Sequence, residues 1–343
     1  MIELLKTLSE INGQSGNEKA VREIIRQEIK PHVDELYVDK FGNLIARKKG
    51  KGSCIMLAAH MDEIGVMVSK IDIDGKVYVS PIGGLEPITL LGEQVHVITK
   101  AGKEIEGIVT TKILQEGDEL EKLPTIEDIY IDIGMSSKEE AEKAGVQIGN
   151  YIDIVKNFIH LGDGKGSLIT GKALDDRIGC YILIELAKRL KHSKAEIYYV
   201  FTVQEEIGLR GAKTSIYSIN PDYAIVLDMT ETDDAKSPLV GKSLSKGPIV
   251  VIKDAEMLTN TCLNDWIIDL GKKHKIPVQP DVSDFGTTDA LNVSVAKGGI
   301  PCTVVGVAVR NIHSTTSVAC EKDIANAIKL LELLLKNPPK LCV

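Results

Sequence analysis

The sequence predicts an α/β fold that is built on an open sheet and interrupted by an inserted all-β module. The first observation is residues 196–203, an almost continuous run of aromatic and β-branched side chains, which is typical of a strand buried on both faces of a parallel sheet. Apolar strand patterns at 54–59 and 223–229 also alternate with helical patterns. Between about residues 66 and 160, short alternating β segments and Gly-containing turns replace that alternation.

Chain length and the insertion together predict two domains. At 343 residues, the chain exceeds the size at which one hydrophobic core usually keeps growing. We expect one domain to comprise residues 1–65 and 161–343, and the inserted domain to comprise residues 66–160. The one evident helix of the insertion, 138–144, begins after Ser137 with Glu140 in its first turn.

The remaining helices are predicted from apolar periodicity and from their end signals. Ser15-Gly-Asn-Glu18 has the pattern of a capping box and predicts a helix that ends before Pro31. The last helix has a wide apolar stripe and ends at Pro338-Pro339. This last helix is expected within residues 322–336, and further helices are expected within residues 1–10, 178–190, 264–273 and 288–296.

Composition excludes several classes of protein. Hydrophobic residues make up 43% and charged residues 26% of the chain, as in ordinary soluble globular proteins. The net charge of −8 disfavours nucleic acid and anionic membrane surfaces as partners. No apolar run approaches the ~20 residues that a membrane helix needs. Because the first ten residues form an amphipathic pattern without a cleavage site, we expect a cytoplasmic protein whose six cysteines are thiols.

Two adjacent carboxylates stand at the end of the predicted central strand. Glu205 and Glu206 are followed by Gly208 and Gly211, which break the strand, and ligands of open α/β sheets collect outside the carboxyl ends of strands. Adjacent side chains there point in different directions. One carboxylate could therefore bind a cation while the other acts as a general base on water. A solvated acidic pair at a helix start is an equally simple interpretation of this stretch alone.

Further acids and histidines follow other apolar strands: His60, Asp175, Asp228 and His313. Imidazole and carboxylate together form a ligand set that holds zinc, cobalt or manganese. The set is too large for a single catalytic zinc ion with an open position, so it favours two metal ions bridged by one carboxylate. Each residue also has a simpler explanation, such as an ordinary hydrogen bond or a helix cap. Their repetition at strand ends favours a functional site.

Two neighbouring residues have predicted supporting roles. Asp62 lies two residues after His60, so the two side chains face the same side of a continuing strand, and Asp62 could accept a hydrogen bond from the ring nitrogen that is not on the metal. Arg177 is expected to clamp nearby carboxylates through its planar guanidinium.

Five ordered motifs resemble those of the M42 family of metalloaminopeptidases. They are His60-Met-Asp-Glu-Ile-Gly65, Leu174-Asp-Asp-Arg177, Glu205-Glu-Ile-Gly-Leu-Arg-Gly-Ala212, Leu227-Asp228 and Ile312-His-Ser314. The resemblance spans nearly the whole chain. It implies a doubly wound, mixed-sheet, zinc-peptidase-like domain with an inserted, β-barrel-like dimerisation domain.

The resemblance also implies the ligands of two divalent metal ions, Zn²⁺ or Co²⁺. Asp175 would bridge the two ions. His60 and Asp228 would complete one metal site, and Glu206 and His313 would complete the other.

The implied activity is the removal of N-terminal residues from short peptides. Glu205 would be the general base, and Asp62 would orient His60. Family members often assemble through dimers into hollow tetrahedral dodecamers, so the resemblance implies a homo-oligomer as well. The sequence departs from the family's usual pattern at residues 230–238, at Asn311 and in Gly286-Thr-Thr-Asp289, which concerns the substrate pocket and leaves the ligands intact.

Two other classes of function remain open from the sequence. Some relatives carry the label endoglucanase, and a glycoside hydrolase needs two carboxyl groups ~5–9.5 Å apart and no metal. Sugar sites also favour aromatic platforms, whereas this chain has one Trp and 4% aromatic residues. A non-catalytic peptide-binding homologue is the third possibility, and it is disfavoured because the ligands and the base are all present.

Overall fold

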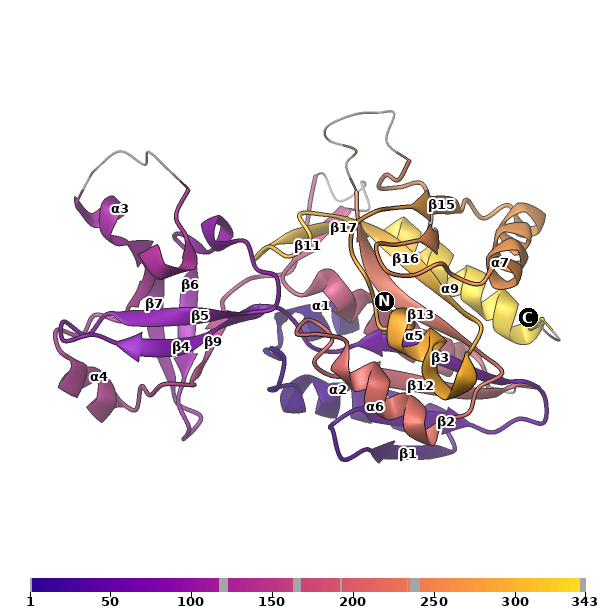
Figure 1. Cartoon of the computed structure of the whole chain (residues 1–343), viewed down its shortest axis with the longest axis horizontal. Helices are drawn as coiled ribbons and strands as arrows, with labels where there is room; N and C mark the ends of the chain where they lie inside the picture. Colours follow the sequence, from indigo (N-terminus) through magenta and orange to yellow (C-terminus); the bar gives the residue numbers. More distant parts are fainter. Residues whose placement is uncertain are drawn as a thin grey trace. The chain divides into compact units, whose positions relative to one another are not determined.

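The computed structural model describes residues 2–116, 123–162, 168–191, 193–232, 234 and 241–339. The chain divides into two compact units (Figure 1). Unit 1 consists of Met1–Asp62, Phe158–Ile312 and Thr316–Val343, and unit 2 consists of Glu63–Asn157 and His313–Thr315. Most of the segment 230–238, in which the sequence departs from the pattern of the family that it resembles, lies outside the described residues.

Unit 1 is built on one mixed sheet with the strand order β1-β2-β12-β3-β13-β16-β17-β11-β10, and β14 joins it through β16 and pairs with β15. The strands are β1 Glu35–Val38, β2 Leu44–Lys48, β3 Cys54–His60, β10 Ile159–His160, β11 Leu168–Gly171, β12 Glu196–Thr202, β13 Tyr223–Glu231, β14 Ile249–Lys253, β15 Gln279–Val282, β16 Cys302–Arg310 and β17 Ser317–Cys320. The predicted central strands are confirmed as β3, β12 and β13, which are parallel neighbours.

The order of the central strands creates a topological switch point. Strand β3 comes first in the chain, β12 pairs along one of its edges, and β13 pairs along the other. The connections that follow β3 and β12 therefore leave in opposite directions, the arrangement that in open α/β sheets forms a ligand-binding crevice at the carboxyl ends of the strands. Nearly every residue of β3 is buried, because helices cover both faces of the sheet.

Helices on the two faces produce two hydrophobic cores. The helices of unit 1 are α1 Glu3–Glu10, α2 Lys19–Ile29, α5 Leu174–Arg189, α6 Arg210–Ser218, α7 Thr261–His274, α8 Ala290–Ser294 and α9 Glu321–Lys336. Ile55 and Leu57 of β3 pack in the core formed with α1, α2, α5, α7 and α9. The alternate residues Met56 and Ala58 pack in the core formed with α6 and α8. The expected doubly wound α/β arrangement is confirmed (Figure 1).

Two predicted helix starts have different outcomes. Ser137 caps α4 (Lys138–Ala144), because its side chain accepts a hydrogen bond from the Glu140 amide at 3.2 Å, and that prediction is confirmed. The prediction of a capping box at residues 15–18 is wrong. Helix α2 begins at Lys19 without a side-chain cap, and Glu18 instead accepts a hydrogen bond from the Gly16 amide at 2.7 Å.

Unit 2 contains a closed barrel with the strand order β4-β5-β8-β7-β6-β9. Its described elements are β4 Gly65–Ile71, β5 Val77–Ile82, β6 Gln94–Ile98, β7 Glu104–Thr111, α3 Lys112–Glu116, β8 Ile129–Asp132, α4 and β9 Tyr151–Ile154. In β6, Val95 and Val97 are buried while the residues between and beside them are more exposed. This alternation is expected for strands that have one face in a barrel core and one face outside.

Two further expectations concern membranes and cysteines. No helix in the described part of the chain is both long enough and apolar enough to cross a membrane. Cys180, Cys302 and Cys320 are buried free thiols, as expected. Cys262 is disulfide-bonded, so the expectation of thiols throughout the chain is wrong. Cys342 lies outside the described residues.

Candidate metal centre

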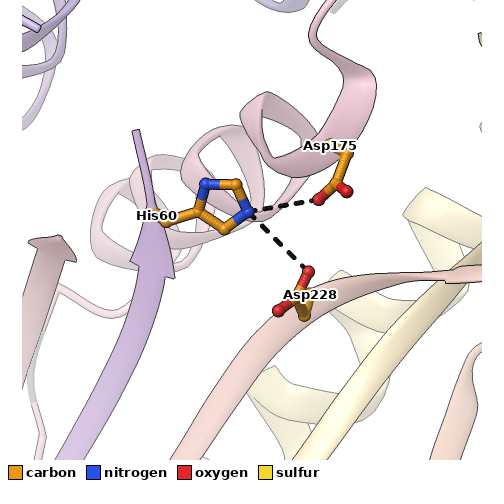
Figure 2. A group of neighbouring side chains, drawn as sticks. All are labelled: His60, Asp175 and Asp228. Atoms are coloured by element: carbon orange, nitrogen blue, oxygen red, sulfur yellow. Dashed lines mark hydrogen bonds and ion pairs between the residues drawn. The ribbon is translucent and has the colours of Figure 1, made fainter. Parts of the chain in front are cut away.

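Three side chains from separate elements meet at the crevice beside β3 (Figure 2). His60 is the last residue of β3, Asp175 lies at the start of α5, and Asp228 is in β13. The Nε2 atom of His60 lies 3.2 Å from Asp175 Oδ1 and 3.9 Å from Asp228 Oδ1. One ligand atom from each of the three lies within 4.8 Å of the others. The geometry and the donor types therefore fit one divalent cation.

The start of α5 separates a structural aspartate from a candidate ligand. Asp175 and Asp176 have non-helical dihedral angles. Asp176 accepts hydrogen bonds from the Gly179 amide at 2.9 Å and from the His60 amide at 3.2 Å. The helix-cap interpretation thus applies to Asp176, whose side chain also ties the helix to the end of β3. Asp175 is left to face the His60 ring.

Asp62 is a fully buried acceptor at the centre of the site. One carboxylate oxygen accepts from the Glu205 amide at 3.0 Å, and the other accepts from the Glu206 amide at 3.2 Å. The Nδ1 atom of His60 lies 3.1 Å from the Asp62 carbonyl oxygen and 3.5 Å from its carboxylate. Burial alone would raise the pKa of Asp62, but hydrogen bonds and the charge of His60 lower it overall. Asp62 therefore fixes the main chain at both glutamates as well as lying beside His60.

The two glutamates occupy a tight turn after β12. Gln204 has a left-handed φ of 56°, and the amides of Gly208 and Leu209 both donate to the Glu205 carbonyl. The Glu205 side chain is 9% exposed, so a fully solvated acidic pair does not describe it. Glu206 is half-buried. Burial raises the pKa of both carboxyl groups, and repulsion from Asp175 contributes to the raised pKa of Glu206.

Like charges are crowded at this crevice. Burial and repulsion from Asp175 raise the pKa of Asp228 well above its ordinary value. Burial alone would lower the pKa of His60, but hydrogen bonds to Asp175 and Asp62 raise it well above its ordinary value. A bound cation would offset this excess of negative charge, so the electrostatics fit a metal as well as the donor geometry does.

Two sequence-predicted residues, His313 and Arg177, make mainly backbone contacts among the interactions that the structure describes. His313 belongs to the short segment His313–Thr315 of unit 2, in which it has a left-handed φ of 56° and its carbonyl accepts from the Glu86 amide at 3.4 Å. Its place in a second metal site, with Glu206, stays a prediction. Arg177 is fully buried and donates to the main-chain carbonyls of Met61 and Ile11 at 2.9 and 3.1 Å. Its predicted carboxylate clamp stays a prediction too.

Asp289 is a further acid near the site that the sequence did not single out for a role. Its buried carboxylate accepts a hydrogen bond from the Thr202 hydroxyl at 2.5 Å, and Thr202 pairs with His60 between neighbouring strands. Burial raises the pKa of Asp289 to about 6, and its charge contributes to the raised pKa of Glu205. In the sequence, Asp289 was visible only as the last residue of the Gly286-Thr-Thr-Asp289 segment. That segment did not predict a chemical role for it.

Comparisons with known proteins agree with this geometry. A family model described as M42 glutamyl aminopeptidase matches residues 42–330. The lysyl aminopeptidase of Pyrococcus furiosus is 36% identical over 341 residues, which cover 98% of this chain and 96% of that protein.

Two solved structures are similar along almost their whole length. One is aminopeptidase APDkam598 from the archaeon Desulfurococcus kamchatkensis, with a TM-score of 0.93, 35% identity and coverage of 99% of this chain and 95% of that chain. The other is the TET1 peptidase of Pyrococcus horikoshii, with a TM-score of 0.88, 32% identity and coverage of 98% and 99%. The fold is that of these peptidases, and its acid-rich site has donor atoms that suit a metal ion. The chain belongs to the M42 family of metal-dependent aminopeptidases.

Proposed function

We propose that the protein is a dinuclear metal-dependent aminopeptidase that removes N-terminal residues from short peptides. The observation that carries the proposal is the conjunction of His60, Asp175 and Asp228, whose donor atoms lie close together, with the buried Glu205 on the neighbouring turn. Membership of the M42 family supports the same activity.

The proposed ligands divide between two divalent cations, Zn²⁺ or Co²⁺. Asp175 would hold both cations, His60 and Asp228 would hold one with it, and Glu206 and His313 would hold the other. When bound, the cations supply Lewis-acid activation of water and of the scissile carbonyl. Carboxylate and imidazole donors suit both of these metals.

Glu205 is proposed to move the proton in peptide hydrolysis. Its carboxylate accepts a proton from the attacking water, and the protonated group then donates that proton to the nitrogen of the leaving amine. Burial raises the pKa of Glu205, which makes the group a stronger base than an exposed carboxylate. Asp62 holds the Glu205 amide at 3.0 Å, so it keeps this base in place while it also lies against His60.

Activity assays with controlled metal content test the proposal. Aminoacyl chromogenic substrates should be hydrolysed by the metal-loaded protein, should not be hydrolysed after chelation, and should be hydrolysed again when Zn²⁺ or Co²⁺ is restored. A glucan substrate assayed in parallel tests the glycoside hydrolase alternative, which the named aminopeptidase relatives disfavour. Metal binding without turnover of any peptide would instead indicate a non-catalytic peptide-binding protein.

We further propose a cytoplasmic homo-oligomer, as large as a tetrahedral dodecamer, in which residues 66–160 act as the dimerisation domain. The barrel unit exposes apolar side chains, including Ile73 at 82% and Ile148 at 73%, which subunit contacts commonly cover. The similar TET1 peptidase is described as assembling into a tetrahedron or an octahedral shell. Light scattering should give a mass several times 37.3 kDa. A fully active monomer would contradict the assembly and leave the catalytic assignment intact.

A further inference from the structure

The segment between α1 and α2 reaches the centre of the candidate site, although it precedes the residues that the family model matches. Ser15 lies in this segment and is 4% exposed. Its hydroxyl donates to a carboxylate oxygen of Asp62 at 2.6 Å. A hydrogen bond to a charged acceptor at this distance is stronger than a neutral one. The serine that the sequence pattern assigned to a helix cap therefore contacts the residue that holds both glutamates.

Arg177 anchors the segment immediately before Ser15. The guanidinium donates to the carbonyls of Leu8 at 2.5 Å and Ile11 at 3.1 Å on one side, and to Met61 at 2.9 Å on the other. Met61 stands between His60 and Asp62, so the arginine joins the N-terminal segment to the end of β3. A Cβ atom on Gly13 would lie 2.7 Å from the guanidinium. A side chain at this position would therefore displace the guanidinium from its hydrogen bonds, so the close approach favours glycine.

Glu18 contacts the same turn from a second direction. Its side chain is 5% exposed, and one carboxylate oxygen accepts from the amides of Gly16 at 2.7 Å and Gln204 at 3.3 Å. Gln204 has a left-handed φ of 56° directly before Glu205, a conformation that is uncommon for a residue other than glycine. Glu18 therefore supports an otherwise unfavourable backbone conformation beside the proposed base.

From these contacts, we propose that Ser15 and Glu18 are positioning residues for Glu205. Ser15 fixes the rotation of the Asp62 carboxylate, and each oxygen of that carboxylate holds the amide of one glutamate. Glu18 fixes the residue before the first of these glutamates. The inference rests on the proposed role of Glu205. Because a displacement of about 1 Å can cost ~10²-fold in rate, loss of this support should lower kcat.

The test compares Ser15→Ala and Glu18→Ala with the control Ser9→Ala. Ser9 is also buried, and its hydroxyl donates to the Lys172 carbonyl at 2.6 Å, so the control removes a similar hydrogen bond from the same part of the chain. Four quantities are measured on full-length protein: kcat, KM, metal content, and amide hydrogen exchange of residues 203–209 in the metal-free protein.

The two test variants should lose about 10–100-fold in kcat, the range typical for residues that orient a catalytic group through another residue. KM and metal content should change by less than about twofold, and exchange at residues 205 and 206 should accelerate. Ser9→Ala should leave all four quantities near the wild-type values. Ser15→Thr should recover most of the kcat, because it restores the hydroxyl.

Three outcomes would overturn the inference. The first is wild-type kcat and exchange in Ser15→Ala. The second is equal loss of kcat in the Ser9 control. The third is loss of metal or of folding in place of a kcat effect. The exchange measurement does not depend on turnover, so it separates this inference from the proposed function. If Glu205→Gln retained activity while Ser15→Ala still accelerated exchange at residues 205 and 206, the proposed base would be wrong, but the positioning of these two residues by Ser15 would stand.

Discussion

The two units of the molecule differ in the buried polar and charged side chains that they contain. Among the described residues of unit 2, Glu63 is the one buried charged side chain, and the barrel core is otherwise apolar. Two of the buried polar groups there close local turns: Thr99 accepts from the Lys103 amide, and Asn150 accepts from the Gln147 amide. In unit 1, several buried acids, among them Asp62, Glu205 and Asp228, lie toward the carboxyl ends of the central strands.

The acids of unit 1 also have partners far away in the sequence. His60 and Asp175 are separated by 115 residues. Burying several carboxylates together is unfavourable unless a cation or hydrogen bonds compensate, and the raised pKa of Asp228 reflects that conflict. The barrel is thus arranged for stability, whereas the crevice keeps an unfavourable charge distribution that a metal can use.

The largest expected effect is on turnover in unit 1. Glu205→Gln should lower kcat by about 10²–10⁴-fold, the usual contribution of a general base, while metal content stays nearly unchanged. Steady-state rates and elemental analysis check both statements. Glu3→Gln, at an exposed position of α1, is the control and should keep full activity. Loss of metal from the Glu205 variant would mean that the roles of the two glutamates are reversed.

Metal stoichiometry should differ between two ligand substitutions. Asp175→Ala should weaken both metals, because the proposed bridge serves two cations, whereas His60→Ala should weaken one. Elemental analysis after dialysis at a fixed free-metal concentration distinguishes them. Two tightly bound metals in the Asp175 variant would contradict the bridging role.

A core substitution in the barrel should lower stability and leave metal content unchanged. Leu90 is fully buried in the barrel core, so Leu90→Ala should lower the stability of unit 2 by about 2–5 kcal/mol. Metal content should not change under conditions in which the protein is folded. Denaturant unfolding and elemental analysis measure the two effects. A metal loss equal to that of His60→Ala would remove the contrast between the units.

The smallest expected change is an increase in the stability of the metal-free protein. Asp228→Asn removes a buried like charge while its Oδ1 can still accept from the Met229 amide, now at 2.7 Å. The metal-free variant should therefore be more stable than the metal-free wild type, because an amide carries no charge that burial and repulsion from Asp175 can penalise. Thermal unfolding in chelator tests this, and a lower unfolding temperature would show that the carboxylate stabilises the apo protein.

The fold could be predicted wherever apolar residues recur in a regular pattern along the chain. Strands β3, β12 and β13 are continuous apolar runs, and α4 has a local cap, so both kinds of element could be located from the sequence. Strand β15 was not predicted, because Gln279-Pro-Asp-Val has neither an apolar run nor alternation, and its pairing with β14 depends on tertiary structure.

The site was predictable only at the level of residue types at strand ends. His60, Asp175 and Asp228 were grouped correctly as neighbours, because parallel strands bring their carboxyl ends to one rim. Ser15 was misread, because a capping box is recognised from residues three apart, whereas its actual partner, Asp62, is 47 positions away. A local pattern contains no information about such a contact.

The switch point at β3 also has a consequence for biosynthesis. Strand β3 is paired with β12 and β13 among the described residues, and β13 begins at Tyr223, roughly 160 residues after His60. At about 5–20 residues per second, a ribosome needs roughly 10–30 s to make that intervening chain. Throughout this interval, the apolar Cys54–His60 segment of the nascent polypeptide lacks the neighbour on one of its edges. Early shielding of that edge, by chaperones or by the N-terminal helices, therefore becomes a requirement for efficient production of the enzyme.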